Sequence, residues 1–109
     1  MQYLTDNTRI KGLLEVTPPI KLIDKLALSS KASKLVFESR NEISSILNQE
    51  DDRLLVVVGP CSIHDPKSAI EYAKKLKPTA DQLSKELKIV MRVYFEKPRT
   101  TVGWKGLIN

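Results

Sequence analysis

The sequence has a single cysteine and no long apolar run. One cysteine cannot form an internal disulfide, which fits a reducing compartment. The longest uninterrupted apolar segment, residues 54–58, is far too short to cross a membrane. The first residues also lack the basic and apolar regions of a signal peptide. We therefore expect a cytoplasmic protein that does not enter a membrane.

Charge of one sign is not concentrated in any segment. The 18 lysine and arginine residues are spread among 13 acidic residues, and the net charge is +5. The sequence has neither a basic block nor an aromatic platform on which nucleic-acid bases could stack. Basic side chains around a site suit a small phosphorylated or carboxylated substrate equally well. A basic module that binds RNA or another polyanion is the alternative interpretation, and a free-standing regulatory or assembly domain is a third.

The segment 54–65, Leu-Leu-Val-Val-Val-Gly-Pro-Cys-Ser-Ile-His-Asp, is the centre of the chain. Its apolar run is typical of a parallel strand buried on both faces, and Gly-Pro ends it. Residues 88–95 predict a second strand. Between the two strands a helix is expected, with Asp65 as its N-cap and Pro66 at its first position. Strand, helix and strand form a βαβ unit, in which the two strands are parallel.

The predicted helix after Asp65 has an apolar inner face, but it also contains Pro78. Proline lacks the amide proton that an interior helical position supplies, so a kink or break is expected near Lys77. The inner face is expected to comprise Ala69, Ile70, Tyr72, Ala73 and Leu76, extended by Leu83 and Leu87.

Before the βαβ unit, the sequence predicts a short strand over residues 9–16 and a short helix that starts after Thr17-Pro18-Pro19. A longer helix is expected over 31–48, with Ser30 as its N-cap. Its apolar face is expected to contain Leu35, Val36, Ile43, Ile46 and Leu47, and its solvent face Lys34, Glu38, Asn41, Glu42 and Ser45.

Polar side chains follow both predicted strands. Cys61 comes just after the first strand, and Lys97 and Arg99 come just after the second. Parallel strands place their carboxyl ends at the same edge of a sheet, where α/β folds carry their chemistry. A thiolate at this edge suits a nucleophile or a soft metal ligand. A small buried hydrophobic residue is the alternative for Cys61.

Arg92 is the most informative cation, because the pattern predicts it inside an apolar strand. An unpaired charge there would be costly, so Arg92 is expected to meet either a protein carboxylate or an anionic ligand. Lys97 and Arg99 flank Pro98, and Thr100 adds a hydroxyl group. Three cations and a hydroxyl at one strand end indicate a polyanionic substrate. Solvated surface charge is the alternative for Lys97 and Arg99.

Two long motifs resemble a known family. Gly-Pro-Cys-Ser-Ile-His-Asp-Pro at 59–66 and Met-Arg-Val-Tyr-Phe-Glu-Lys-Pro-Arg-Thr-Thr-Val-Gly-Trp-Lys-Gly-Leu-Ile-Asn at 91–109 closely resemble 3-deoxy-D-arabino-heptulosonate-7-phosphate (DAHP) synthases of the feedback-regulated bacterial and fungal type. The resemblance implies condensation of phosphoenolpyruvate with D-erythrose 4-phosphate, the first step of the shikimate pathway. It also implies an α/β fold in which residues 53–109 begin a (β/α)8 TIM barrel and residues 1–52 form a mostly helical N-terminal extension. The chain would then be the first part of a longer polypeptide, and would be inactive alone.

The resemblance also implies roles for individual residues. Cys61 matches a ligand of a required divalent metal ion, such as Mn²⁺ or Fe²⁺. Arg92 and Lys97 match residues that hold phosphoenolpyruvate, and Lys97 is also the candidate catalytic residue, for proton transfer. Arg99 and Thr100 match residues that hold erythrose 4-phosphate. In the N-terminal extension, Asp6 and Asn7 match a region that binds an aromatic amino acid effector, and the extension implies a homo-dimer or tetramer. No nucleic acid or membrane partner is expected.

Overall fold

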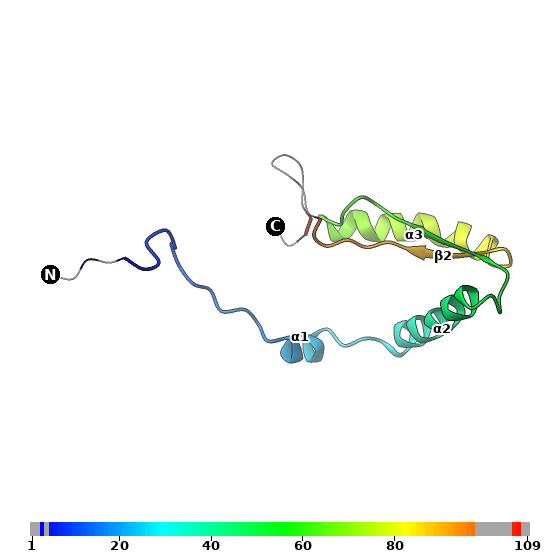
Figure 1. The fold of residues 1–109 in the computed structure, drawn as a ribbon, viewed down its shortest axis with the longest axis horizontal. Coiled ribbons are helices and arrows are strands. Elements are labelled where there is room, and N and C mark those ends of the chain that lie inside the picture. The colour runs from blue at the N-terminus through cyan, green and yellow to red at the C-terminus, as the bar shows by residue number, and fades with distance from the viewer. Residues whose placement is uncertain (1–2, 4, 98–105, 108–109) are drawn as a thin grey trace. The chain divides into compact units, whose positions relative to one another are not determined.

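The computed structural model describes residues 3, 5–97 and 106–107. The elements in this part of the chain are α1 (Pro19–Lys25), α2 (Ser30–Leu47), β1 (Leu54–Val58), α3 (Pro66–Gln82) and β2 (Leu87–Met91), as Figure 1 shows. They belong to two compact units, residues 1–35 and 36–109. None of the helices in the described ranges is long and apolar enough to span a membrane.

The first unit contains the predicted short helix but not the predicted strand. α1 begins at Pro19, as the run of prolines indicates, and the amide of Leu26 donates to the carbonyl of Leu22 at its end. The strand predicted at residues 9–16 is wrong, because residues 10–18 adopt no regular structure. Leu13 and Leu14 are 86% and 95% exposed. The segment therefore has neither a neighbouring strand nor a packed face to stabilise extended pairing.

Helix α2 begins one residue before the predicted start and has a different cap. The amide of Ala32 donates to the Ser29 hydroxyl at 3.2 Å, so Ser29 rather than Ser30 occupies the capping position. At the other end, Gln49 has a φ of 62°. The amide of Gln49 donates to the carbonyl of Ile46, and the amide of Glu50 donates to that of Ser45. These two bonds form a Schellman motif, which stops the helix.

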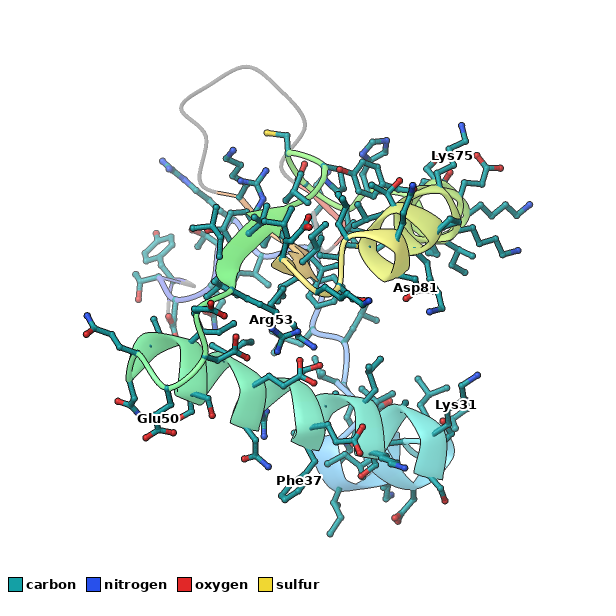
Figure 2. All side chains as sticks on the ribbon, turned by 90° about the vertical axis from the view of Figure 1, so that its right-hand side faces the viewer. Lys31, Phe37, Glu50, Arg53, Lys75 and Asp81 are labelled. Atoms are coloured by element: carbon teal, nitrogen blue, oxygen red, sulfur yellow. The ribbon has the colours of Figure 1, made fainter. Side chains whose placement is uncertain are left out.

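The packed face of α2 differs from the prediction. Ile43 and Ile46 are half-buried as expected, but Leu47 is 71% exposed. Glu42, predicted to face solvent, is half-buried and meets the cations of Arg53 and Lys88. Figure 2 shows Arg53 between the helix and the sheet, whereas Phe37 points away from them. The sequence pattern therefore placed the edge of the packed face of α2 wrongly. Glu42 lies on the packed side because Arg53 and Lys88, which are distant in the sequence, attract its carboxylate.

The predicted parallel βαβ unit is confirmed. β1 and β2 pair in parallel, with Leu54 opposite Leu87 and Val58 opposite Met91. Helix α3 packs against β2, as Figure 1 shows. The second strand ends at Met91 rather than at residue 95, since its partner strand stops at Val58 and turns away at Gly-Pro. The last stretch of the predicted strand is therefore a loop beyond the sheet.

Helix α3 starts as predicted and continues past its proline. Asp65 accepts hydrogen bonds from the amides of Lys67 and Ser68, and Pro66 takes the first position. The break expected near Lys77 is wrong, because α3 runs unbroken to Gln82. Lys74 and Pro78 are both exposed, so the carbonyl that loses its amide partner remains accessible to water.

The inner face of α3 is largely as predicted. Ala69, Tyr72, Ala73 and Leu76 are half-buried, but Ile70 is 55% exposed and Leu87 belongs to β2. The sequence pattern therefore identified the packed side of the helix and overestimated its width and length.

Little of the chain is fully buried. Within the described ranges the buried residues are Ile63 and Ser62, at 5% and 8% exposed, and Gly106. Leu54 and Val57 of β1 are 65% and 60% exposed, so the predicted burial of this strand on both faces is not reached. A sheet of two strands with one helix against it cannot cover both faces of β1.

Candidate functional site

The loops after β1 and β2 are joined through their backbones. The amide of Arg92 donates to the Val58 carbonyl at 2.9 Å, and the amide of Ile63 donates to the Tyr94 carbonyl at 2.6 Å. Gly59 packs against the segment after β2, since an added Cβ would collide with the Arg92 carbonyl oxygen. This contact requires glycine, and it brings the residues after the two strands to one edge of the sheet.

Cys61 and Lys97 meet at this edge. The Lys97 ammonium donates to the Cys61 sulfur, with 3.0 Å between Nζ and Sγ. Cys61 is exposed, so its alternative role as a buried hydrophobic residue is wrong. The thiolate is the form of cysteine that attacks electrophiles or binds metals, and the ammonium complements its negative charge. The predicted proximity of these two groups is confirmed.

Arg92 lies beside this pair, one residue beyond the end of β2, and is half-buried. Its Nη2 donates to the Pro60 carbonyl at 2.9 Å and to the Gly59 carbonyl at 3.5 Å. Its Cζ lies 5.1 Å from the centre of the Tyr94 ring. Its Nε is buried without an acceptor, and no carboxylate in the described ranges pairs with the guanidinium. Of the two expected partners for Arg92, a protein carboxylate is therefore not found among the described residues.

A short bridge closes the loop that follows β2. The amide of Leu107 donates to the Phe95 carbonyl at 2.8 Å, and Glu96 pairs with Gly106 in an antiparallel bridge. Gly106 has a φ of 152°, and a Cβ there would strike Phe95. The bridge therefore places Gly106 beside Glu96, which is next to Lys97 in the segment after β2. Arg99 and Thr100 lie outside the described residues.

The proposed effector residues lie in the first unit. Asp6 and Asn7 are exposed in a turn, in which the amide of Ile10 donates to the Asn7 carbonyl at 3.1 Å. Asn7 has a φ of 56°, a conformation that asparagine tolerates better than most residues. The turn presents two polar side chains to solvent.

An ion cluster, comprising Glu42, Asp51, Arg53 and Lys88, lies at the amino ends of the strands. Arg53 donates to both carboxylate oxygens of Asp51 and to the Ser84 carbonyl. Its Nη2 is also 3.4 Å from Glu42 Oε2, the same oxygen that pairs with Lys88. The hydrogen bond from Lys88 lowers the pKa of Glu42, and the hydrogen bond from Arg53 lowers the pKa of Asp51. The cluster ties α2 to both strands at the end opposite Cys61.

Comparison with known proteins identifies the family. The sequence model of the DAHP synthetase I family matches residues 26–109. The chain belongs to this family. It is 60% identical over 104 residues to a phospho-2-dehydro-3-deoxyheptonate aldolase of Haemophilus influenzae, and 56% identical over 109 residues to the Phe-sensitive one of Escherichia coli K12. These matches cover 95% and 100% of this chain.

A solved structure has the same local fold as this chain. The structure of phospho-2-dehydro-3-deoxyheptonate aldolase from Francisella tularensis matches with a TM-score of 0.84 and 53% identity, over 92% of this chain. The chain spans 29% of that structure and 29% and 31% of the two relatives above. The chain therefore spans less than a third of each of these three proteins.

The described residues of the chain contain no complete metal site. No group of three or more histidine, cysteine, aspartate and glutamate side chains among them could hold a metal ion. Cys61 has the exposure and the soft donor atom that one ligand of a divalent transition metal requires.

Sequence reasoning missed the groups that hold Arg92 in this family member. The Gly59 and Pro60 carbonyls leave no signature, because every residue has a carbonyl. The position of Tyr94 was a weak signal. It lies two residues after Arg92, and residues two apart in an extended chain have their side chains on the same face. The ion cluster was also missed, because its members come from three segments whose proximity only the fold determines.

Proposed function

We propose that this chain is the amino-terminal part of a DAHP synthase, which condenses phosphoenolpyruvate with D-erythrose 4-phosphate and consumes one water to give DAHP and phosphate. The observation that carries the proposal is the contact between Lys97 and Cys61, with Arg92 beside them, within the motifs of a DAHP synthetase I chain. Cations and a thiol at one strand edge match the charge of two phosphorylated substrates. The comparisons give no support to RNA binding.

The proposed fold of the complete synthase is a (β/α)8 barrel. Residues 53–109 supply its first βα units, and residues 1–52 precede it as an extension. The parallel register of β1 and β2 and the position of Cys61 at the carboxyl end support this, since TIM barrels carry their chemistry there. The exposed apolar side chains of β1 also support it, because further barrel strands would cover them.

The cations have separate roles in the proposed reaction. Arg92 and Lys97 bind the carboxylate and phosphate of phosphoenolpyruvate, neutralise their charge and orient C3 toward the aldehyde carbon of erythrose 4-phosphate. Arg99 and Thr100 hold the phosphate of the second substrate, an assignment that rests on the Lys-Pro-Arg-Thr motif. Lys97 Nζ transfers a proton to the aldehyde oxygen as C3 bonds to the aldehyde carbon; water adds at C2 of phosphoenolpyruvate, and phosphate then leaves. Arg92 would gain a partner for its buried Nε.

A divalent metal ion such as Mn²⁺ or Fe²⁺ completes the proposed site. Cys61 contributes one ligand, and the remaining ligands come from the rest of the synthase. When bound, such an ion polarises carbonyl groups as a Lewis acid. The ammonium of Lys97, 3.0 Å from the sulfur, lies close enough to act on the same substrate.

Regulation and assembly are assigned to the extension. Asp6 and Asn7 contact an aromatic amino acid effector, and the extension forms contacts in a homo-dimer or tetramer in the cytoplasm. The exposed turn at these residues supports an effector contact. The name of the Phe-sensitive relative, which is 56% identical over the whole chain, supports the class of effector.

The test uses the full-length synthase, supplied with phosphoenolpyruvate, erythrose 4-phosphate and Mn²⁺, with phosphate release as the measurement. We expect product with the metal and none after chelation. Cys61→Ala should abolish the metal-dependent activity, whereas Lys85→Ala, at an exposed lysine away from the site, should not change it. Absence of product from the folded wild type would refute the proposed function. Near-normal turnover of Cys61→Ala would refute the ligand assignment.

A further inference from the structure

Arg92 is held between two different groups. On one side its Nη2 donates to the Pro60 carbonyl at 2.9 Å. The Tyr94 ring provides a second contact, with its centre 5.1 Å from the Arg92 Cζ. This distance lies within the range at which an aromatic face attracts a cation. Neither contact involves Nε, which is buried and has no acceptor.

We propose that Tyr94 is a positioning residue for phosphoenolpyruvate, because its ring holds the Arg92 guanidinium with the unpaired Nε ready for an anion. This inference rests on the proposed function. Tyr94 is 48% exposed, so its ring does not belong to the core. The function of the ring is therefore separable from stability, which makes it testable.

The backbone at Tyr94 is anchored to the loop that carries Pro60. The Tyr94 carbonyl accepts a 2.6 Å hydrogen bond from the amide of Ile63, which is only 5% exposed. The same loop carries Pro60, whose carbonyl holds the other contact to Arg92. The ring and the carbonyl that contact the guanidinium therefore belong to two backbone segments that are hydrogen-bonded to each other.

The consequence for binding follows from the flexibility of arginine. A free arginine side chain samples many rotamers, and an anion that binds it must select one of them. Holding the guanidinium in advance lowers that cost and preserves the planar geometry that a carboxylate or phosphate needs. The ring touches no reacting atom, so its loss should weaken phosphoenolpyruvate binding more than it slows the chemical step.

The experiment compares Tyr94→Leu with Tyr94→Phe in the full-length synthase. Tyr94→Leu removes the aromatic face and should raise the KM for phosphoenolpyruvate about 3- to 10-fold. The kcat and the KM for erythrose 4-phosphate should change less than about twofold. Tyr94→Phe keeps the face and should behave as the wild type. An unchanged KM in Tyr94→Leu, or an equal loss in Tyr94→Phe, would overturn the proposal.

Fluorinated phenylalanines at position 94 provide a test that does not depend on how well a leucine is accommodated. Added ring fluorines weaken the negative face of the ring while keeping its shape. The KM for phosphoenolpyruvate should rise with each added fluorine, and a flat series would overturn the proposal.

A double-mutant cycle separates positioning of Arg92 from a general structural effect. In an Arg92→Ala background, Tyr94→Leu should cause no further rise in KM, since the group it positions is absent. A rise equal to that in the wild-type background would overturn the inference. If Arg92→Ala raises the KM and Tyr94→Leu does not, only the inference fails. If the folded wild type makes no DAHP, the proposed function fails with it.

Discussion

Gly59 is the residue that allows the segments after β1 and β2 to lie close together. A Cβ at this position would collide with the Arg92 carbonyl, and both groups belong to backbone that cannot rotate away. We expect Gly59→Ala to lower the free energy of unfolding of the full-length synthase by about 1–3 kcal/mol, the usual cost of overpacking. It should also reduce activity, because the displaced backbone carries Arg92. Denaturant titration and the phosphate-release assay measure the two effects.

Gly12→Ala is the matched control, since no other atom lies within 4 Å of a Cβ built on Gly12. It should leave stability within about 0.5 kcal/mol of the wild type and activity unchanged. Equal free energies of unfolding for Gly59→Ala and Gly12→Ala would show that the segments after β1 and β2 can move apart without destabilising the protein.

At this scale the sequence predicted part of the site. The meeting of Cys61 and Lys97 followed from one rule, that parallel strands end at the same edge. The groups around Arg92 could not be predicted, because backbone carbonyls and the angle of a ring depend on the exact path of two loops. The roles of Arg99 and Thr100 stay predictions, since both lie outside the described residues.

Among the elements, helix α2 carries the clearest dependence on pH. Lys88 lowers the pKa of Glu42 from its usual 4.5, so the folded state favours the charged carboxylate. The resulting stability is fully present above pH 4.5 and is lost as the pH falls through the lower pKa of the folded state. Because the Glu42 side chain is 39% exposed, we expect a loss of about 1 kcal/mol at most.

The measurement is the free energy of unfolding of full-length wild type and Glu42→Gln, near neutral pH and at about pH 3.5. The wild type should lose more stability than Glu42→Gln over this interval. Identical losses would assign the acid sensitivity to other carboxylates.

The C-terminal end of α2 offers a stabilising substitution. Gln49 adopts a φ of 62° in the Schellman motif, where a side chain costs about 1–2 kcal/mol and glycine does not. Gln49→Gly should therefore raise the free energy of unfolding by about 0.5–1 kcal/mol, after the greater entropy of glycine in the unfolded chain is subtracted. Gln49→Ala keeps a Cβ and should give no gain. Denaturant midpoints of the two variants provide the comparison, and a gain in both would contradict the explanation.

Elements were predicted best where the signal is local. Asp65 and Pro66 marked the start of α3 because capping needs only neighbouring residues. The ends of strands and the packed faces of helices were predicted less well. β2 ends where β1 turns away, and Glu42 is drawn inward by Arg53 and Lys88, so both depend on segments distant in the sequence.

For the molecule as a whole, the exposed apolar surface predicts how the isolated chain should behave. Leu54 and Val57 of β1 are mostly exposed, and only three of the described residues are buried. We expect residues 1–109 alone to bind a hydrophobic dye, to unfold without a cooperative transition and to have no synthase activity. Calorimetry, dye fluorescence and the phosphate-release assay test this, with the full-length synthase as control. A sharp thermal transition in the isolated chain would contradict the expectation.

The α/β class and the parallel unit were predictable from the sequence, because apolar runs and caps reveal strands and helices. Closure into a barrel was not, since neighbouring strands beyond β1 and β2 are needed to define it. That part came from resemblance of the motifs, and the barrel itself stays a proposal.

The two ends of the short parallel sheet differ in kind. Charged pairs bind α2 at the amino ends, while Cys61, Lys97 and Arg92 gather at the carboxyl ends, roughly 15 Å away along strands of five residues. Selection can therefore act on heat tolerance and on turnover through separate sets of mutations. Directed evolution for survival at high temperature should change residues around Glu42 and leave Cys61, Lys97 and Arg92 unchanged.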